Sequence, residues 1–93
     1  MLTEKQMNWF KEITQIDGVS GHEHNVASYM RNAFTDMGAD ELLSDALGSV
    51  IAVKRSKNKD AKRVMILGHM DEVGFLVKDI TPRGGLLLHP VGG

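Results

Sequence analysis

His69 and Asp71 are the residues of this chain whose types and spacing are best suited to chemistry. Residues two apart lie on the same side of an extended chain, so both side chains can face one site. A histidine can bind a metal ion through one ring nitrogen and donate its other N–H to a carboxylate, which fixes the tautomer and the ring orientation. The spacing alone leaves two interpretations open: a metal ligand with its supporting acid, or a solvated histidine followed by a turn aspartate.

An apolar run, Val64–Leu67, leads directly into this pair. Four large apolar residues without alternation predict a strand that is covered on both faces, as in a sheet between two layers of helices. Ligands of open α/β sheets bind at the carboxyl ends of such strands. The sequence therefore places His69 where this kind of fold forms its sites.

Other polar residues invite a functional interpretation but have a simpler one. Glu72 follows Asp71 and resembles a general base, yet its side chain should point to the opposite side of an extended chain. His22 and His24 flank Glu23 at the predicted start of a helix. They are either metal ligands or exposed polar residues beside a capping glutamate, and we favour the second interpretation.

The basic run Lys54–Arg63 carries six Lys and Arg residues in ten positions. Such runs can bind phosphates, but this one has no aromatic residues among them and separates two predicted strands. We interpret it as a solvated loop. His89, which precedes Pro90, has no second ligand near it in the sequence and is expected at a surface or interface.

Local patterns predict the elements that must hold the pair. Thr3 and Gln6 form a capping box at the start of a first helix, and Ser20 and Glu23 form a similar pattern before a second helix that Gly38 should end. The apolar residues of both segments recur at helical spacing. The predicted helices span 4–14 and the residues from 23 to 37, and the predicted strands span 42–43, 49–54, 64–68, 73–80 and 86–89, the last two joined as a hairpin.

The composition is that of a folded domain with no sign of nucleic-acid binding. Of the 93 residues, 42% are hydrophobic and 25% are charged, and the net charge is −1. There is no cysteine, which excludes disulfides and thiolate metal sites. No apolar stretch has membrane-spanning length and no signal peptide is recognisable, so we expect a cytoplasmic location. A domain of this length normally buries roughly 60–65% of its unfolded surface.

Four segments together resemble the glutamyl/deblocking aminopeptidase family, a group of two-metal exopeptidases of which some carry the name endoglucanase. Gly68–Phe75 is similar to the family signature, and Gly18–Glu23 is similar to its N-terminal Gly-x-Ser-Gly-x-Glu turn. Asp45–Val50 resembles the family's Asp-x-x-Gly-Asn-hydrophobic strand entry, with Ser49 where asparagine is commoner. Gly84–Gly93 resembles the start of the family's dimerisation domain. The resemblance covers essentially the whole chain.

The resemblance implies an α/β fold that is the N-terminal part of a three-layer sheet domain, followed by the first hairpin of a β-rich dimerisation domain. It divides the chain into 1–72 and 73–93, with His69 as a metal ligand and Asp71 as the active-site residue that supports it. The remaining ligands and the general base would follow Gly93. The chain alone should therefore not hydrolyse peptides, and the alternative is a short non-enzymatic paralogue or interaction module.

The same resemblance implies two divalent metal ions, zinc or cobalt, in the longer protein, with none held stably by these residues alone. The expected partners are a peptide substrate and further copies of the chain, with no nucleic acid and no membrane. The predicted layout supports self-association independently, because no helix follows the apolar strand and the final hairpin has no cover. Uncovered strand edges and apolar faces pair readily with another copy.

Overall fold

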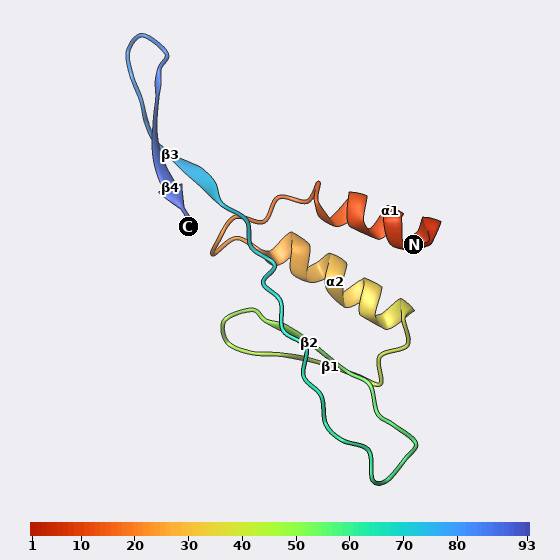
Figure 1. The fold of residues 1–93 in the computed structure, drawn as a ribbon. Helices are drawn as coiled ribbons and strands as arrows, with labels where there is room; N and C mark the ends of the chain where they lie inside the picture. The colour runs from red at the N-terminus through yellow and green to blue at the C-terminus, as the bar shows by residue number, and fades with distance from the viewer.

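The computed structural model describes all 93 residues and contains two helices and two antiparallel hairpins (Figure 1). The elements are, in chain order, α1 (Glu4–Ile13), α2 (His24–Asp36), β1 (Glu41–Ser44), β2 (Val50–Val53), β3 (Gly74–Ile80) and β4 (Leu86–Val91). The small α/β character expected from the sequence is therefore present. Neither helix has the length and apolar content needed to cross a membrane.

Helix α1 begins as its capping box predicts. The Thr3 hydroxyl accepts the N–H of Gln6, and the Gln6 side chain accepts the N–H of Thr3 in return. Helix α2 ends at Asp36, with Met37 as its C-cap, and Gly38 follows at the predicted helix end with a φ of 79°. A positive φ is reached without strain by glycine, which makes this residue suited to the helix end.

The start of α2 differs from the capping box predicted for Ser20 and Glu23. Glu23 is the N-cap residue, but its side chain caps no helical N–H and accepts the N–H of Gly21 instead. The Ser20 hydroxyl donates to Asp71, which lies 51 residues further along the chain. The predicted local pairing is wrong because α2 begins at His24 with Glu23 as its N-cap, so Ser20 lies three residues before the N-cap and cannot cap the helix.

Helix α2 lies between α1 and the β1–β2 hairpin, while the β3–β4 hairpin projects away from them (Figure 1). Two apolar residues of α2, Val26 and Ala27, are buried. The Tyr29 hydroxyl donates to the Glu12 carboxylate at 2.7 Å and joins the two helices. The helix pair is therefore held by a few contacts along one side of α2.

Each hairpin is shaped by its turn. In the β1–β2 turn, Asp45 Oδ1 accepts the N–H groups of Leu47 and Ser49 at 3.0 and 2.9 Å. The β3–β4 hairpin, predicted from the sequence, has a bulge between Val77 and Asp79 and a turn that includes Gly84 with a φ of 83°. Both ladders are antiparallel, so neither supplies the parallel sheet that the apolar run was predicted to join.

The prediction of a buried strand at Val64–Leu67 is wrong for this chain. The segment forms no ladder, and its four residues are between 80% and 93% exposed. A strand needs neighbouring backbone to satisfy its N–H and C=O groups, and both two-stranded sheets are composed of other residues. These 93 residues therefore form helices and hairpins but not the three-layer sheet that the resemblance implies.

The chain has almost no core of its own. Only 3 of 93 residues are buried and the accessible surface is 8246 Å², against about 5,300 Å² for a compact protein of this size. By the same scaling, the chain buries about 44% of its unfolded surface rather than the 60–65% expected. The radius of gyration is 17.9 Å, whereas a compact chain of this length has about 12 Å.

Candidate metal-ligand site

His69 and Asp71 face each other, as their spacing predicts. The Nδ1 atom of His69 lies 2.9 Å from Asp71 Oδ1 and 3.0 Å from the Asp71 carbonyl oxygen. Both neighbours are acceptors, so Nδ1 must carry the proton that it donates to them. The other ring nitrogen, Nε2, is then left with a free lone pair, and the side chain is 85% exposed. This is the arrangement of a histidine prepared to bind a metal through Nε2.

Asp71 is held from both sides. Its Oδ1 accepts from His69, and its Oδ2 accepts the Ser20 hydroxyl at 2.5 Å. These two hydrogen bonds, that from Ser20 first and that from His69 second, lower the pKa of the Asp71 carboxyl below its usual value. The carboxylate is therefore ionised and oriented near neutral pH, as a group that supports a histidine must be.

The turn that carries Ser20 is fastened to the segment after His69 by its backbone. Val19 and Glu72 form an isolated parallel bridge. The Glu72 N–H donates to the Gly18 carbonyl at 2.8 Å, and the Gly18 N–H donates to Glu72 Oε1 at 3.2 Å. The Glu72 side chain is thus used to hold the turn, which agrees with the prediction that it is not aimed with His69 and Asp71.

Two glycines allow the chain to pass close to this turn. A Cβ atom at Gly74 would lie 2.1 Å from Val19 Cγ1, and one at Gly92 would lie 2.8 Å from Ser20 Oγ. Gly92 also has a φ of 76°, which favours glycine. Both ends of the β3–β4 hairpin therefore approach the turn more closely than a side chain would permit.

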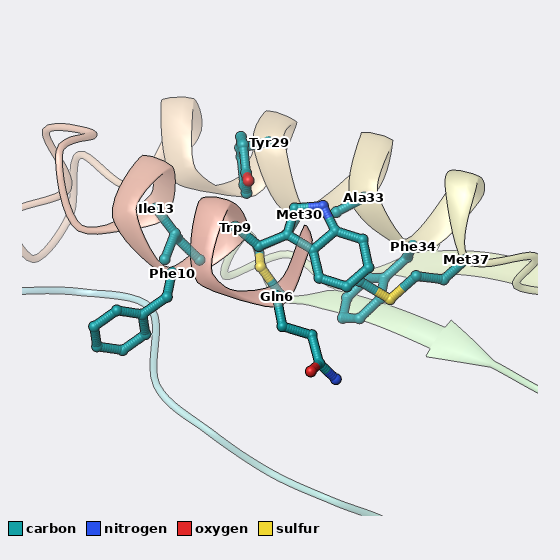
Figure 2. A pocket seen from close by; sticks show the side chains of 9 residues that line it. All are labelled: Gln6, Trp9, Phe10, Ile13, Tyr29, Met30, Ala33, Phe34 and Met37. Carbon is teal, nitrogen blue, oxygen red and sulfur yellow. The ribbon is translucent and has the colours of Figure 1, made fainter. Parts of the chain in front are cut away.

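An open hollow of about 230 Å³ lies beside the pair. It is lined by His69, Asp71, Glu72, Val73 and Gly93, of which only Val73 has a hydrophobic side chain. A second hollow of about 250 Å³ lies between α1 and α2 and is lined almost entirely by apolar side chains (Figure 2). The two hollows share no residue, and only the first is lined by a histidine and carboxylates.

The chain offers one oriented ligand rather than a complete metal site. No group of three or more His, Asp and Glu side chains is placed to hold a metal ion. His22, His24 and His89 are exposed and are not gathered with His69. A catalytic zinc ion takes about three protein ligands and a water molecule. The free Nε2 of His69 fits one of those positions, and the other positions need groups beyond those that these residues bring together.

Sequence reasoning missed Ser20 as a member of this site. Ser20 and Glu23 matched a capping pattern, which gave the serine a local partner and removed the reason to look for a distant one. Its contact with Asp71 spans 51 residues and has no local signature. The only available signal was the Gly-x-Ser-Gly segment itself, since glycines on both sides of a serine indicate a backbone that approaches another part of the chain.

Comparison with known proteins shows that the chain is similar to aminopeptidases. Residues 48–93 match the M42 glutamyl aminopeptidase family. A putative aminopeptidase of Escherichia coli, SgcX, is 46% identical over 81 residues, which are 87% of this chain and 21% of that protein. The glutamyl aminopeptidase of Lactococcus lactis is 37% identical over 89% of this chain and 23% of its own length.

A solved structure agrees with these matches. The crystal structure of an endoglucanase from Thermotoga maritima superimposes with a TM-score of 0.74 and 38% identity, over 89% of this chain and 26% of that one. The chain is thus similar in sequence to aminopeptidases, and its α/β fold is similar to part of that solved structure. The similarity to glutamyl aminopeptidases extends over most of the chain. It spans between a fifth and about a quarter of the length of the curated relatives that it matches.

Proposed function

We propose that this chain is the N-terminal portion of a metal-dependent aminopeptidase that releases N-terminal residues from peptides. Residues 1–72 would belong to the catalytic domain, where a three-layer sheet would include Val64–Leu67, and residues 73–93 would begin the dimerisation domain. The observation that carries the proposal is the His69 ring, whose Nδ1 donates to Asp71 and whose Nε2 is free beside an open hollow. The similarity to the M42 glutamyl aminopeptidase family supports the assignment to peptidases.

In this proposal His69 is a ligand of one of two divalent ions, zinc or cobalt, and Asp71 is the active-site residue that holds the ring. Such ions polarise a carbonyl oxygen and lower the pKa of a bound water molecule. Asp71 fixes the Nδ1–H tautomer, which leaves the Nε2 lone pair of a ring that lines the hollow available to a metal ion. Because these residues supply a single oriented ligand, the 93-residue chain alone would be inactive and would not retain a metal stably.

We also propose a substrate, a cellular location and an oligomeric state for the protein. The substrate would be a peptide, the location would be cytoplasmic, and the protein would form homo-oligomers without nucleic-acid or membrane partners. A net charge of −1 supports the absence of a nucleic-acid partner. The uncovered apolar surface supports assembly with other copies or with further residues of the same protein.

The test is His69→Ala in the full natural protein, with His89→Ala as the matched control, because His89 is an exposed histidine on β4 outside the hollow. Bound metal is counted by elemental analysis, and hydrolysis of short peptides is followed separately. His69→Ala should lower the metal content by about one ion per chain and reduce activity at least a hundredfold, since a lost ligand costs more than the 10–100-fold of an outer-shell partner. Unchanged metal content and turnover would reject the role of His69.

A second candidate function is a short, non-enzymatic interaction module that retains this part of the fold. The lack of any three-ligand group in the chain favours it. The two candidates differ in the gene: an open reading frame that continues past Gly93 into further acidic and histidine motifs supports the aminopeptidase. A natural stop codon there, with no peptide hydrolysis by the purified protein, supports the module.

A further inference from the structure

We propose that Ser20 is a positioning residue for the candidate metal site, and that its hydroxyl orients the Asp71 carboxylate so that His69 keeps its Nε2 atom free for a metal ion. This inference rests on the proposed function for its purpose, but its geometry stands on hydrogen bonds within the chain. Ser20, Asp71 and His69 form a continuous series: hydroxyl to carboxylate at 2.5 Å and carboxylate to imidazole at 2.9 Å.

The need for Ser20 follows from the exposure of the groups that it orders. The side chain of Asp71 is 38% exposed and that of His69 is 85% exposed. Exposed side chains of this kind rotate freely unless hydrogen bonds restrict them. His69 alone holds one carboxylate oxygen, which leaves the carboxylate free to swing about that contact. The Ser20 hydroxyl holds the second oxygen, and a hydrogen bond between a hydroxyl and a carboxylate is among the stronger kinds in proteins.

Ser20 is itself well placed to impose an orientation. Its turn is tied to Glu72 by two hydrogen bonds that involve Gly18 and not the serine hydroxyl. On another side, Gly92 approaches Ser20 Oγ so closely that a Cβ there would lie only 2.8 Å away. The hydroxyl therefore occupies a restricted position between Asp71 and the backbone at Gly92, directly after β4.

A purely structural role makes a different prediction. If the serine hydroxyl only pinned the turn to the segment after His69, its removal would release the turn. The turn has its own backbone ties to Glu72, so removal of the hydroxyl should leave the turn in place and change the imidazole instead. The two roles can be separated by measuring, in the same variant, the hydrogen exchange of the Glu72 N–H and the tautomer of the His69 ring.

The experiment compares Ser20→Ala with Ser20→Thr, which keeps a hydroxyl, in the full natural protein. Ser44→Ala is the matched control, because it removes a hydroxyl that is bonded to Arg31 and lies outside the site. In metal-free protein labelled with ¹⁵N at histidine, the ring-nitrogen shifts report the tautomer of His69, with His69→Ala identifying its signals. Hydrogen exchange of the Glu72 N–H reports the turn, and titration with Co²⁺ alone reports metal affinity through its visible absorption.

Ser20→Ala should shift His69 from the Nδ1–H form toward a mixture of tautomers, with Glu72 exchange unchanged. Affinity for Co²⁺ should fall about tenfold, at the lower end of the range for groups that orient a metal ligand. Ser20→Thr should restore both readings, and Ser44→Ala should alter neither.

An unaltered His69 tautomer in Ser20→Ala would overturn the inference, as would loss of Glu72 protection or failure of Ser20→Thr to restore the tautomer. The proposed function is tested apart from this. A tautomer change in a protein that binds no Co²⁺ would support the positioning role and reject the metal site. Normal Co²⁺ binding by Ser20→Ala, with the His69 tautomer unchanged, would support the metal site and reject the positioning role of Ser20.

Discussion

At the residue scale, the contact between Tyr29 and Glu12 gives the helix pair a defined response to alkaline pH. The Tyr29 phenol donates to the Glu12 carboxylate, which raises the pKa of Tyr29 from 10 to about 12. The folded state thus favours the protonated phenol, so this contact contributes stability below pH 10 and loses it as the pH rises through about 12. Absorbance of tyrosinate should show the shift directly, since the chain contains one tyrosine.

The matched variant for this prediction is Glu12→Gln. The amide keeps the size of the side chain but removes its negative charge, so the pKa of Tyr29 should return toward 10. Glu4→Gln, in the first turn of α1 and outside this contact, should leave the titration where it is. A Tyr29 titration near 10 in the unmodified chain would show that the two helices are not joined by this hydrogen bond.

The candidate site was predictable from the sequence to the extent that its contacts are local. His69 and Asp71 are two residues apart, and the extended backbone predicted their common direction correctly. The capping box of Thr3 and Gln6 was equally local and equally correct. Ser20 was assigned wrongly because α2 begins three residues later than the capping pattern indicates, and the partner of the serine hydroxyl, Asp71, is far away in the sequence.

At the element scale, the same distinction separates the predicted elements that form from the one that does not. Both helices, the strands predicted at 42–43 and 49–54, and the hairpin predicted at 73–89 depend on capping, periodicity and turn residues within a few positions of each other, and all of them are present. A strand at Val64–Leu67 depends on neighbouring strands that its own residues cannot specify. Its apolar composition favours a buried strand, but only residues distant in the sequence can provide the neighbouring strands of a sheet.

The close contact between β3 and the turn before α2 leads to a prediction at the same scale. Gly74→Ala would place a methyl group 2.1 Å from Val19 Cγ1, so the start of β3 must move away from the turn. Overpacking of this kind costs about 1–3 kcal/mol. Because the Glu72 N–H bonds to Gly18 beside this contact, its hydrogen exchange should become at least fivefold faster.

A double-variant cycle identifies the cause. Val19→Ala removes the methyl groups that the new side chain would meet, so the cost of Gly74→Ala should fall clearly in that background. Gly68→Ala is a suitable control, since a Cβ at Gly68 would meet no atom within 4 Å. Equal effects of Gly74→Ala with and without Val19→Ala would show that backbone freedom, rather than crowding by Val19, makes glycine necessary.

At the scale of the whole molecule, the main feature is the surface left uncovered. The excess over a compact protein of this size is about 3,000 Å², from an accessible surface of 8246 Å². Monomeric proteins rarely leave continuous apolar patches of more than a few hundred Å² exposed. Large side chains of β3, β4 and Val64–Leu67 make up much of what is exposed here. The elements therefore fold locally but require a further surface, from the same protein or from another copy, to complete a core.

This incompleteness predicts that the 93-residue chain self-associates when it is isolated. Sedimentation velocity should show species larger than a monomer whose proportion rises with concentration, because exposed apolar strands and strand edges pair with each other. Ile66→Lys places a charge in the middle of Val64–Leu67, where Ile66 is 93% exposed, and should shift the distribution toward monomer. Leu47→Lys makes the same kind of change at an equally exposed residue, 92%, in the β1–β2 turn, and should have little effect. A concentration-independent monomer for the unmodified chain would contradict the prediction, and equal responses to the two lysines would place the contact elsewhere than at Val64–Leu67.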